Sequence, residues 1–153
     1  MVQFCESFQY IDLDRVIDIA DSLLNPNGFM LICDFFKKPI HVEYGLKGGH
    51  KFDKFMEIMN NSNFRILEDI DITAETAPNM DILDRATKEV IIPIADAADR
   101  FLMSRHPWIT KLVKWKYRKK LEKAHNKYLY GKRTGKDFME QKTYHLFVCR
   151  KGK

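Results

Sequence analysis

The chain has 153 residues, of which 45% are hydrophobic and 31% charged, so it is large enough for one domain with a substantial core and too apolar for a disordered protein. The segment Lys111–Lys136 holds eleven basic residues and one acidic residue, a net charge of +10, and the remainder holds fifteen basic and twenty acidic residues, a net charge of −5. The positive charge therefore belongs to one segment, which could face a nucleic acid, an anionic membrane or an acidic partner.

Several sequence features argue against whole classes of protein. No apolar run approaches the roughly 20 residues of a membrane-spanning helix, and residues 1–6 lack the basic and then apolar pattern of a signal peptide. The cysteines Cys5, Cys33 and Cys149 lie in separate strand-like apolar runs without the paired spacing of a metal site. We therefore expect buried free thiols, no bound metal and a cytoplasmic protein, with peripheral contact at a membrane left open.

Taken in chain order, the apolar pattern predicts strands that alternate with helices. Apolar or alternating runs predict four strands, at residues 2–5, 29–33, 64–72 and 143–149. Apolar residues at helical spacing predict helices over residues 13–24 and 52–59, and a helical region from about residue 80 to 141. The third strand alternates apolar with acidic residues, which indicates a place near a sheet edge. The order as a whole favours an open α/β sheet.

The second predicted strand begins after a tight turn and ends at a carboxylate. Pro26 cannot continue the preceding helix, and Asn27 and Gly28 tolerate the left-handed conformation that such a turn needs. Phe29–Cys33 is an unbroken apolar run, which is typical of a strand covered on both faces, and Asp34 follows it.

Two loops near the predicted sheet have alternative interpretations. Between Phe35 and His50, the sequence Gly-Leu-Lys-Gly-Gly (Gly45 to Gly49) is either a phosphate-binding loop or a flexible loop near a pocket. After the third strand, Thr73–Asn79 either lines the rim of the same pocket or is a capping loop that leads into the helical region.

In this order, the segments resemble the C-terminal half of class I S-adenosylmethionine-dependent methyltransferases. Leu24–Asp34 is similar to the Leu-x-Pro-Gly-Gly-x-Leu-x-x-x-Asp turn and fifth strand of that family, and Cys5–Ile11 to its fourth strand and the turn after it. Phe55–Asp71 resembles the next helix and the sixth strand, and Tyr144–Arg150 resembles the last strand, which is antiparallel and inserts between the fifth and the sixth. The resemblance implies a single domain over residues 1–153: a partial Rossmann-like open α/β sheet of three parallel strands and a final antiparallel strand, with a helical cap at about residues 80–141.

The cofactor motifs of that family are missing from these residues. Its first strand ends in a Gly-rich loop whose backbone amides approach the cofactor, and its second strand ends in an acidic residue for the ribose hydroxyls; neither pattern is present. The resemblance implies methyl transfer to a small, apolar acceptor by the intact fold, and weak or absent S-adenosylmethionine binding by this chain alone, as in a truncated enzyme. The alternative is a non-catalytic interaction module whose basic helix docks on an acidic partner, a membrane surface or a nucleic acid.

Ligands of open α/β sheets bind beyond the carboxyl ends of the parallel strands. We therefore expect the cofactor-binding or substrate-binding residues after the first two strands, namely Ser7, Phe8, Gln9, Tyr10, Asp34 and Phe35. By the resemblance, the polar side chains after the first strand would orient the methionyl end of the cofactor or the acceptor; the alternative is a turn with polar caps. Glu6 is a candidate general base, and so is His41 or His50 if the glycine loop folds over the acceptor, the alternative for both being a surface loop histidine.

Two surfaces are candidates for contact with partners. The basic helix places Trp108, Leu112 and Trp115 on one line among lysines, which leaves three interpretations open: a helix packed on the domain with a solvated basic side, a helix on an anionic membrane, or contact with a nucleic acid, for which no motif is present. The first strand would be an exposed edge, so we expect it to pair with a second copy or with a missing N-terminal half.

Overall fold

The computed structural model describes residues 1–40, 46–126, 128 and 133–152. The strands have the bounds β1 Val2–Cys5, β2 Phe29–Lys37, β3 Phe64–Asp71 and β4 Lys142–Lys151. The elements that connect the first three strands are the 3-10 turn η1 Phe8–Tyr10 and the helices α1 Leu13–Leu23 and α2 Phe52–Asn60. Between β3 and β4, the described helices are α3 Thr73–Ala86, the π-helical turn η2 Thr87–Ile91, α4 Ile92–Arg105, α5 Pro107–His125 and α6 Gly135–Gln141.

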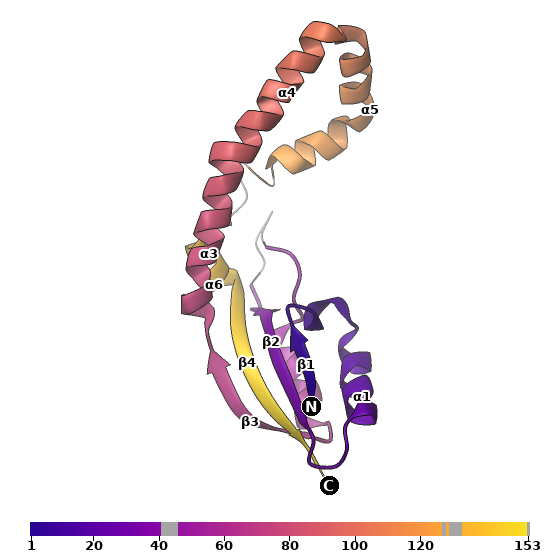
Figure 1. Cartoon of the computed structure of the whole chain (residues 1–153), viewed down its shortest axis with the longest axis vertical. Helices are drawn as coiled ribbons and strands as arrows, with labels where there is room; N and C mark the ends of the chain where they lie inside the picture. Colours follow the sequence, from indigo (N-terminus) through magenta and orange to yellow (C-terminus); the bar gives the residue numbers. More distant parts are fainter. Residues whose placement is uncertain (41–45, 127, 129–132, 153) are drawn as a thin grey trace.

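The four strands form one open sheet in the order β1-β2-β4-β3. β1 pairs with β2 in parallel, and β4 runs antiparallel to both β2 and β3, so the first three strands point in one direction (Figure 1). The predicted fold class is confirmed: three parallel strands, with the last strand of the chain inserted antiparallel between the second and the third. β1 and β3 are the edges of this sheet, as the sequence indicated for both.

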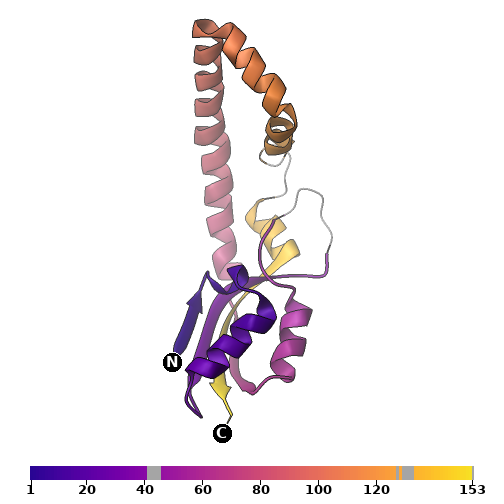
Figure 2. The ribbon, with the colours of Figure 1, turned by 90° about the vertical axis from the view of Figure 1, so that its right-hand side faces the viewer.

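The main core lies on the face of the sheet that α1 and α2 cover (Figure 2). Asp12 caps α1 by accepting hydrogen bonds from the backbone amides of Asp14 and Arg15, so the helix starts where its apolar stripe begins. The side chains that pack on the sheet are Leu13, Val16, Ile17 and Ala20 of α1 and Phe55 and Met59 of α2. Aromatic rings dominate the contact, with the ring centres of Phe36 and Phe55 separated by 4.7 Å.

Strand β2 differs from the expectation in its length and in its covering. It pairs with β4 along its whole length to Lys37, so the prediction that it stops at Cys33 is wrong. Met30 and Ile32 are buried, whereas Leu31 and Cys33 are only half-buried. The prediction of a strand covered on both faces is therefore wrong too, because helices cover one face along its length and the other face only at one end.

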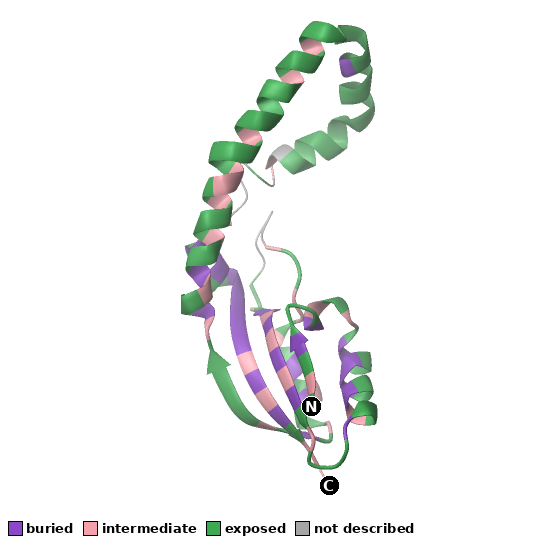
Figure 3. Cartoon of the chain, viewed as in Figure 1, coloured by how far each residue is buried: buried purple, intermediate pink, exposed green. Residues whose placement is uncertain are grey.

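On the second face, α3 and α6 cover the sheet near the carboxyl ends of β1 and β2 (Figure 3). Ala77, Phe138 and Tyr144 form a small buried cluster there. Cys5 and Cys33, which are neighbours in the register of β1 and β2, lie on the less covered part of this face, Cys5 exposed and Cys33 half-buried. The expectation of buried thiols is correct for Cys149 alone among the three.

Helix α6 begins in direct contact with α3. A Cβ atom on Gly135 would lie 2.6 Å from both the Ala77 carbonyl oxygen and Asp81 Oδ2, so the contact requires glycine. The Gly135 amide donates a hydrogen bond of 2.8 Å to Asp81 Oδ1, and Thr134 and Asp137 form a capping box at the same helix end. This contact fixes α6 over the end of the sheet.

The helices α3 to α5 form an arm that leads away from the sheet (Figure 1). The arm starts at Thr73, directly after β3, so Thr73–Asn79, which the sequence left open as a pocket rim or a capping loop, is the first part of helix α3. Helix α5 turns back after His106 and is joined to α4 by an ion pair between Lys114 and Asp99, with Nζ and Oδ2 2.6 Å apart. The interpretation of a basic helix packed through its aromatic face on the domain is wrong, because Trp108 is 86% exposed and α5 has one buried residue, Thr110, among the side chains described (Figure 3).

Candidate functional site

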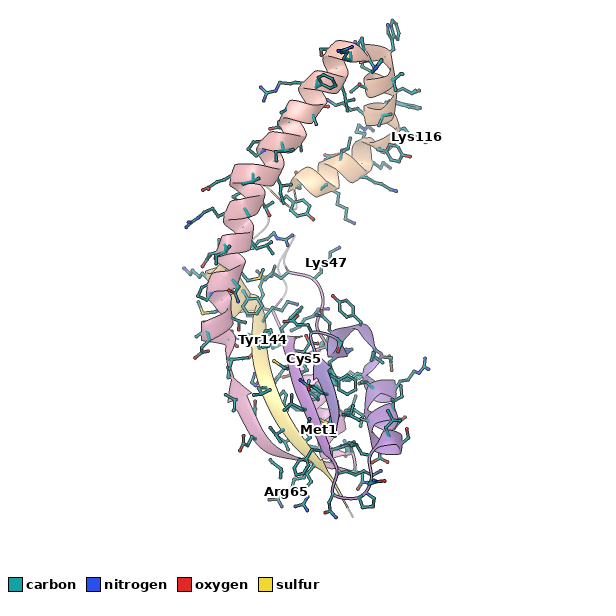
Figure 4. All side chains as sticks on the ribbon, viewed as in Figure 1. Met1, Cys5, Lys47, Arg65, Lys116 and Tyr144 are labelled. Carbon is teal, nitrogen blue, oxygen red and sulfur yellow. The ribbon has the colours of Figure 1, made fainter. Side chains whose placement is uncertain are left out.

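A pocket of about 360 Å³ opens where the carboxyl ends of β1 and β2 meet α3 and α6. Its apolar lining consists of Phe35, Leu46, Met80 and Phe138, and its charged lining of Glu6, Lys47, Arg133 and Lys142. Tyr144 also lines it; Figure 4 places this residue at the end of the sheet next to the arm, with Lys47 nearby and Lys116 far off on α5. The pocket therefore occupies the place where ligands bind in open α/β sheets.

Glu6 and Tyr144 form the hydrogen-bonded pair on one side of the pocket. Glu6 adopts a left-handed backbone conformation, with φ 54°, directly after β1, and its amide donates a hydrogen bond of 3.0 Å to the Cys33 carbonyl oxygen. The Tyr144 hydroxyl donates to Glu6 Oε1 and lies 3.8 Å from Cys33 Sγ. Burial, and next the hydrogen bond to Glu6, raise the pKa of Tyr144 well above its usual value. The phenol thus stays protonated and holds the carboxylate of Glu6 at the pocket.

Lys142 is a buried amine on another side of the pocket. It is the first residue of β4 and is 1% exposed. Its Nζ donates a hydrogen bond of 2.5 Å to the Gly48 carbonyl oxygen and lies 5.3 Å from the centre of the Phe35 ring. Burial, and next the charge of Lys37, lower the pKa of Lys142 to about 8. An amine with such a pKa exchanges its proton close to neutral pH.

The charge of the pocket is positive. Lys47 and Arg133 lie in its lining beside Lys142, and Glu6 is the one carboxylate there among the described residues. None of these three cations forms an ion pair with a carboxylate in the described part of the chain. Arg133 packs its guanidinium over the ring of Tyr128, 5.1 Å from the ring centre. The pocket therefore combines an apolar wall with an excess of positive charge.

Asp34, which was predicted as a site residue, has a structural role. It is 1% exposed, and its carboxylate accepts hydrogen bonds from the amides of Gln9, at 3.1 Å, and Phe35, at 2.8 Å. Burial raises the pKa of Asp34, and these amides oppose the effect. The side chain ties the turn after β1 to β2 and does not line the pocket.

The remaining predicted residues after β1 lie outside the pocket lining. Phe8 is fully buried in the main core, and Ser7 and Tyr10 are exposed. Gln9 accepts a hydrogen bond of 3.1 Å from the Gly49 amide through Oε1. Of the predicted cofactor-binding, substrate-binding and catalytic residues that the structure describes, Glu6 and Phe35 line the pocket.

The described part of the glycine loop is held in place by hydrogen bonds of its backbone. Gly48 and Gly49 have φ values of 83° and 75°, and their carbonyl and amide groups bond Lys142 and Gln9, respectively. His50 Nε2 donates a hydrogen bond of 3.1 Å to the Phe8 carbonyl oxygen and does not line the pocket. His41 and Gly45 lie outside the described residues.

Across the sheet from the pocket, a second polar cluster is buried. His145 bonds Asp69 through Nδ1, and its Nε2 lies 2.6 Å from Thr143 Oγ1. The imidazole stacks on Phe147, with 5.1 Å between ring centres. Asp69 borders a shallow hollow on the surface, whose lining does not include Thr143, His145 or Phe147. The cluster connects β3 with β4.

Most of the pocket residues were not predicted from the sequence. Phe138 comes from the end of the helical region and Lys142 from the start of β4, more than one hundred residues after Glu6 and Phe35. One signal was present: Lys142 and Tyr144 are two positions apart in a strand, which places both side chains on the same face of the sheet. Thr76 and Asn79 line the pocket, as one of the two interpretations of their segment had it, but they do so from a helix.

Comparison with known proteins identifies the fold. No family model and no curated protein matches the chain, but solved structures do. The geranyl diphosphate C-methyltransferase from Streptomyces coelicolor A3(2) is 13% identical, with a TM-score of 0.53 over 97% of this chain and 46% of that one. A putative sarcosine dimethylglycine methyltransferase from Galdieria sulphuraria is 13% identical, with a TM-score of 0.55 over 98% of this chain and 52% of that one.

These similarities show a class I S-adenosylmethionine-dependent methyltransferase fold. The chain spans about half the length of the solved relatives. A third match, the cyclase SpnF, is 16% identical, with a TM-score of 0.52 over 98% of this chain and 48% of that one. Because one of these relatives is named for a cyclisation, the fold by itself does not fix the reaction.

The described residues do not by themselves form a cradle for S-adenosylmethionine. The polar groups of the turn after β1 bond within the chain. The Gln9 amide donates to the Asp34 carboxylate, and the Gln9 side chain accepts from the Gly49 amide. The Gly-rich loop that follows the first strand of that family has no counterpart in these residues. In addition, none of the helices in the described part of the chain has the length and apolar character needed to cross a membrane.

Proposed function

We propose that this chain is the acceptor-binding half of an S-adenosylmethionine-dependent methyltransferase and that a segment preceding it supplies the cofactor-binding half. The observation that carries the proposal is the pocket at the carboxyl ends of β1 and β2 under α3 and α6, in a sheet with the class I methyltransferase fold. A small molecule in the pocket would contact Glu6, whose carboxylate is held by Tyr144. That carboxylate would accept the proton that a methyl acceptor loses.

The uncovered part of the sheet supports the second half of the proposal. The edge of β1 presents backbone groups that pair with no other strand in the described chain. Next to it, Gln3 and Cys5 are exposed and Leu31 is half-buried. A doubly wound sheet covers such a face with helices and continues beyond such an edge with further strands. The solved relatives are about twice as long as this chain, which is the length that those elements require.

Titration calorimetry with S-adenosylmethionine tests the proposal. The ligand is titrated into this chain and into the polypeptide extended at its N-terminus by the coding sequence immediately upstream, here called the extended polypeptide. We expect binding by the extended polypeptide only. Tight binding by this chain alone would show that its own residues hold the cofactor, and failure of both to bind would remove the methyltransferase assignment.

The oligomeric state distinguishes the two occupants that the sequence suggested for the edge of β1. If a preceding segment covers the edge, light scattering after gel filtration should show a monomer of the extended polypeptide. A second copy paired through β1 would instead give a dimer. Gln3→Pro should dissociate that dimer, because proline removes a backbone donor from the edge.

The second candidate function is an interaction module that docks through α5 on an anionic membrane. The specific observation is the exposed outer face of this helix, where Trp108 is 86% and Trp115 74% exposed, with Ile109 and Leu112 between them. Lys116 and Lys119 border the same face. Aromatic side chains interleaved with lysines suit the boundary between lipid headgroups and acyl chains.

Vesicle sedimentation tests this candidate. The chain should bind vesicles of phosphatidylserine and phosphatidylcholine, and binding should weaken with added salt and upon Lys116→Glu with Lys119→Glu and Lys120→Glu. Lys136→Glu, which lies on α6, is the matched control. Equal binding to pure phosphatidylcholine, or none to either vesicle, contradicts the candidate; oligonucleotide binding lost in the same triple variant would favour a nucleic acid instead.

A further inference from the structure

Burying the charged amine of Lys142 costs folding free energy. Lys142 is 1% exposed, and its one described hydrogen bond leads to a neutral acceptor, the Gly48 carbonyl oxygen, at 2.5 Å. Buried cations in proteins are ordinarily paired with a carboxylate. In the described part of the chain, no carboxylate forms an ion pair with Lys142. The amine is nevertheless in the lining of the pocket, where a ligand can reach it.

Two further cations come to the same pocket from separate elements. Lys47 precedes α2 and Arg133 precedes α6, while Lys142 starts β4. The carboxylate of Glu6 accepts the hydrogen bond of Tyr144, so the pair occupies its own side of the lining. Three positive groups from three parts of the chain thus meet around a space of about 360 Å³. Such a space can receive one anionic group of a small molecule.

The rest of the lining is apolar and aromatic. Phe35 and Phe138 meet edge to face, with ring centres 6.4 Å apart, and Leu46 and Met80 extend this wall. Phe138 is fixed through α6, whose start at Gly135 is in contact with α3. A ligand that is charged throughout would leave this wall in contact with polar groups, and a purely apolar ligand would leave Lys142 without an anionic partner.

We propose that the pocket binds a small amphiphilic anion, with a carboxylate or phosphate head at Lys142 and Arg133 and an apolar body against Phe35 and Phe138. As an assignment of the methyl acceptor, this rests on the proposed function, because it makes the amphiphile the molecule that the enzyme modifies. It replaces the simply apolar acceptor that the sequence suggested.

Protonation of Lys142 gives the proposal a second readout. An anion at Nζ favours the charged amine, so binding raises the pKa of Lys142 from its value of about 8 in the free pocket. Affinity should therefore fall as the pH rises through about 8, and binding above that pH should take up protons from the buffer. The other ionisable groups that face the amine are Lys37, Glu6, Lys47, Arg133 and Tyr144. Tyr144 keeps its proton across this range, because its pKa is raised above its usual value.

The experiment is calorimetric titration of this chain, without S-adenosylmethionine, by octanoate, octyl phosphate, octanol and octylamine. We expect octanoate or octyl phosphate to bind, octanol to bind at least about tenfold more weakly, and octylamine not to bind. Lys142→Met, which keeps a similar side-chain volume, should weaken anion binding at least about tenfold, abolish proton uptake and leave octanol binding unchanged. Lys136→Met, at an exposed position of α6, is the control and should bind as the parent chain does.

Equal affinity for octanol and both anions, or anion binding unchanged in Lys142→Met, would overturn the proposal. Circular dichroism of each variant shows whether it is folded, and Arg133→Gln offers an independent test on a residue outside the sheet. The result is separable from the proposed function. Anion binding by this chain, together with an extended polypeptide that fails to bind S-adenosylmethionine, would retain the pocket and reject the methyltransferase; the reverse outcome would retain the methyltransferase and reject the anionic acceptor.

Discussion

Substitution of Lys142 by methionine should stabilise the chain, and the gain should disappear at high pH. In the unfolded chain a lysine has a pKa of 10.5, and in the folded chain burial lowers the pKa of Lys142 to about 8. At about 1.4 kcal/mol for each pH unit, this difference corresponds to a penalty of about 3 kcal/mol for holding the charged amine inside the fold. Methionine fills a similar volume without charge but loses the hydrogen bond to Gly48, so we expect a net gain of about 2 kcal/mol at neutral pH.

The sign of the pH dependence follows from the two protonation states. Between about pH 8 and pH 10.5 the unfolded chain binds more protons at this residue than the folded chain, so stability rises with pH in this window. The parent chain should therefore gain about 3 kcal/mol relative to Lys142→Met as the pH rises through the window. The assay is urea unfolding followed by far-ultraviolet circular dichroism, with Lys136→Met as an exposed control. A difference between parent and variant that does not change with pH would refute the reasoning, because it would mean that the amine is solvated in the folded chain.

Three further predictions concern other buried groups. Burial raises the pKa of Cys149 from 9.0 to about 12, so stability should be lost as the pH rises from about 9 towards 12, and Cys149→Ala should remove this loss, which urea unfolding measures. Gly135→Ala should destabilise the chain by about 1–3 kcal/mol and weaken ligand binding in the pocket, because the new methyl group would overlap the Ala77 carbonyl oxygen; the neighbouring Lys136→Ala should do neither. Tyr144→Phe should cost about 1 kcal/mol in thermal unfolding, because the hydrogen bond to Glu6 is lost, and an unchanged melting temperature would contradict this.

The sheet could be predicted from sequence because its signals are local. The turn at Pro26 and the apolar run that follows it define β2, and the alternation of Phe64–Ile72 defines an edge strand. Asn27 has the left-handed backbone expected for the turn, with φ 64°. The position of β4 between β2 and β3 was predicted from the family resemblance. Local periodicity cannot predict it, because the strands that pair with β4 lie far from it in the sequence.

The end of β2 could not be predicted, because its extension depends on distant residues. Asp34 would end an isolated strand, but here two backbone amides satisfy its carboxylate, and Phe35 and Phe36 pair with residues of β4 more than one hundred positions later. The same long-range pairing carries Lys142 to the lining of the pocket. In the sequence, Lys142 resembles any solvated lysine that follows a basic segment, so its burial becomes visible only in the fold.

The exposed face of α5 shows the opposite limitation. A line of Trp108, Leu112 and Trp115 in sequence is the usual sign of a helix that packs on a core. In the structure this line faces outward, because the arm formed by α3 and α4 holds α5 away from the sheet (Figure 4). Periodicity identifies the apolar face of a helix, and only the tertiary arrangement decides whether the chain itself covers that face.

The proposed function requires that a preceding segment completes the β1 edge and the less covered face of the sheet, and hydrogen exchange measures this directly. Amide exchange of β1 and β2 would be followed by mass spectrometry in this chain and in the extended polypeptide, with α1 and α2 as internal references. We predict fast exchange at Gln3 and Cys5 in this chain and strong protection of both in the extended polypeptide, with the two reference helices unchanged. Exchange at β1 that is equally fast in the two proteins would contradict the account.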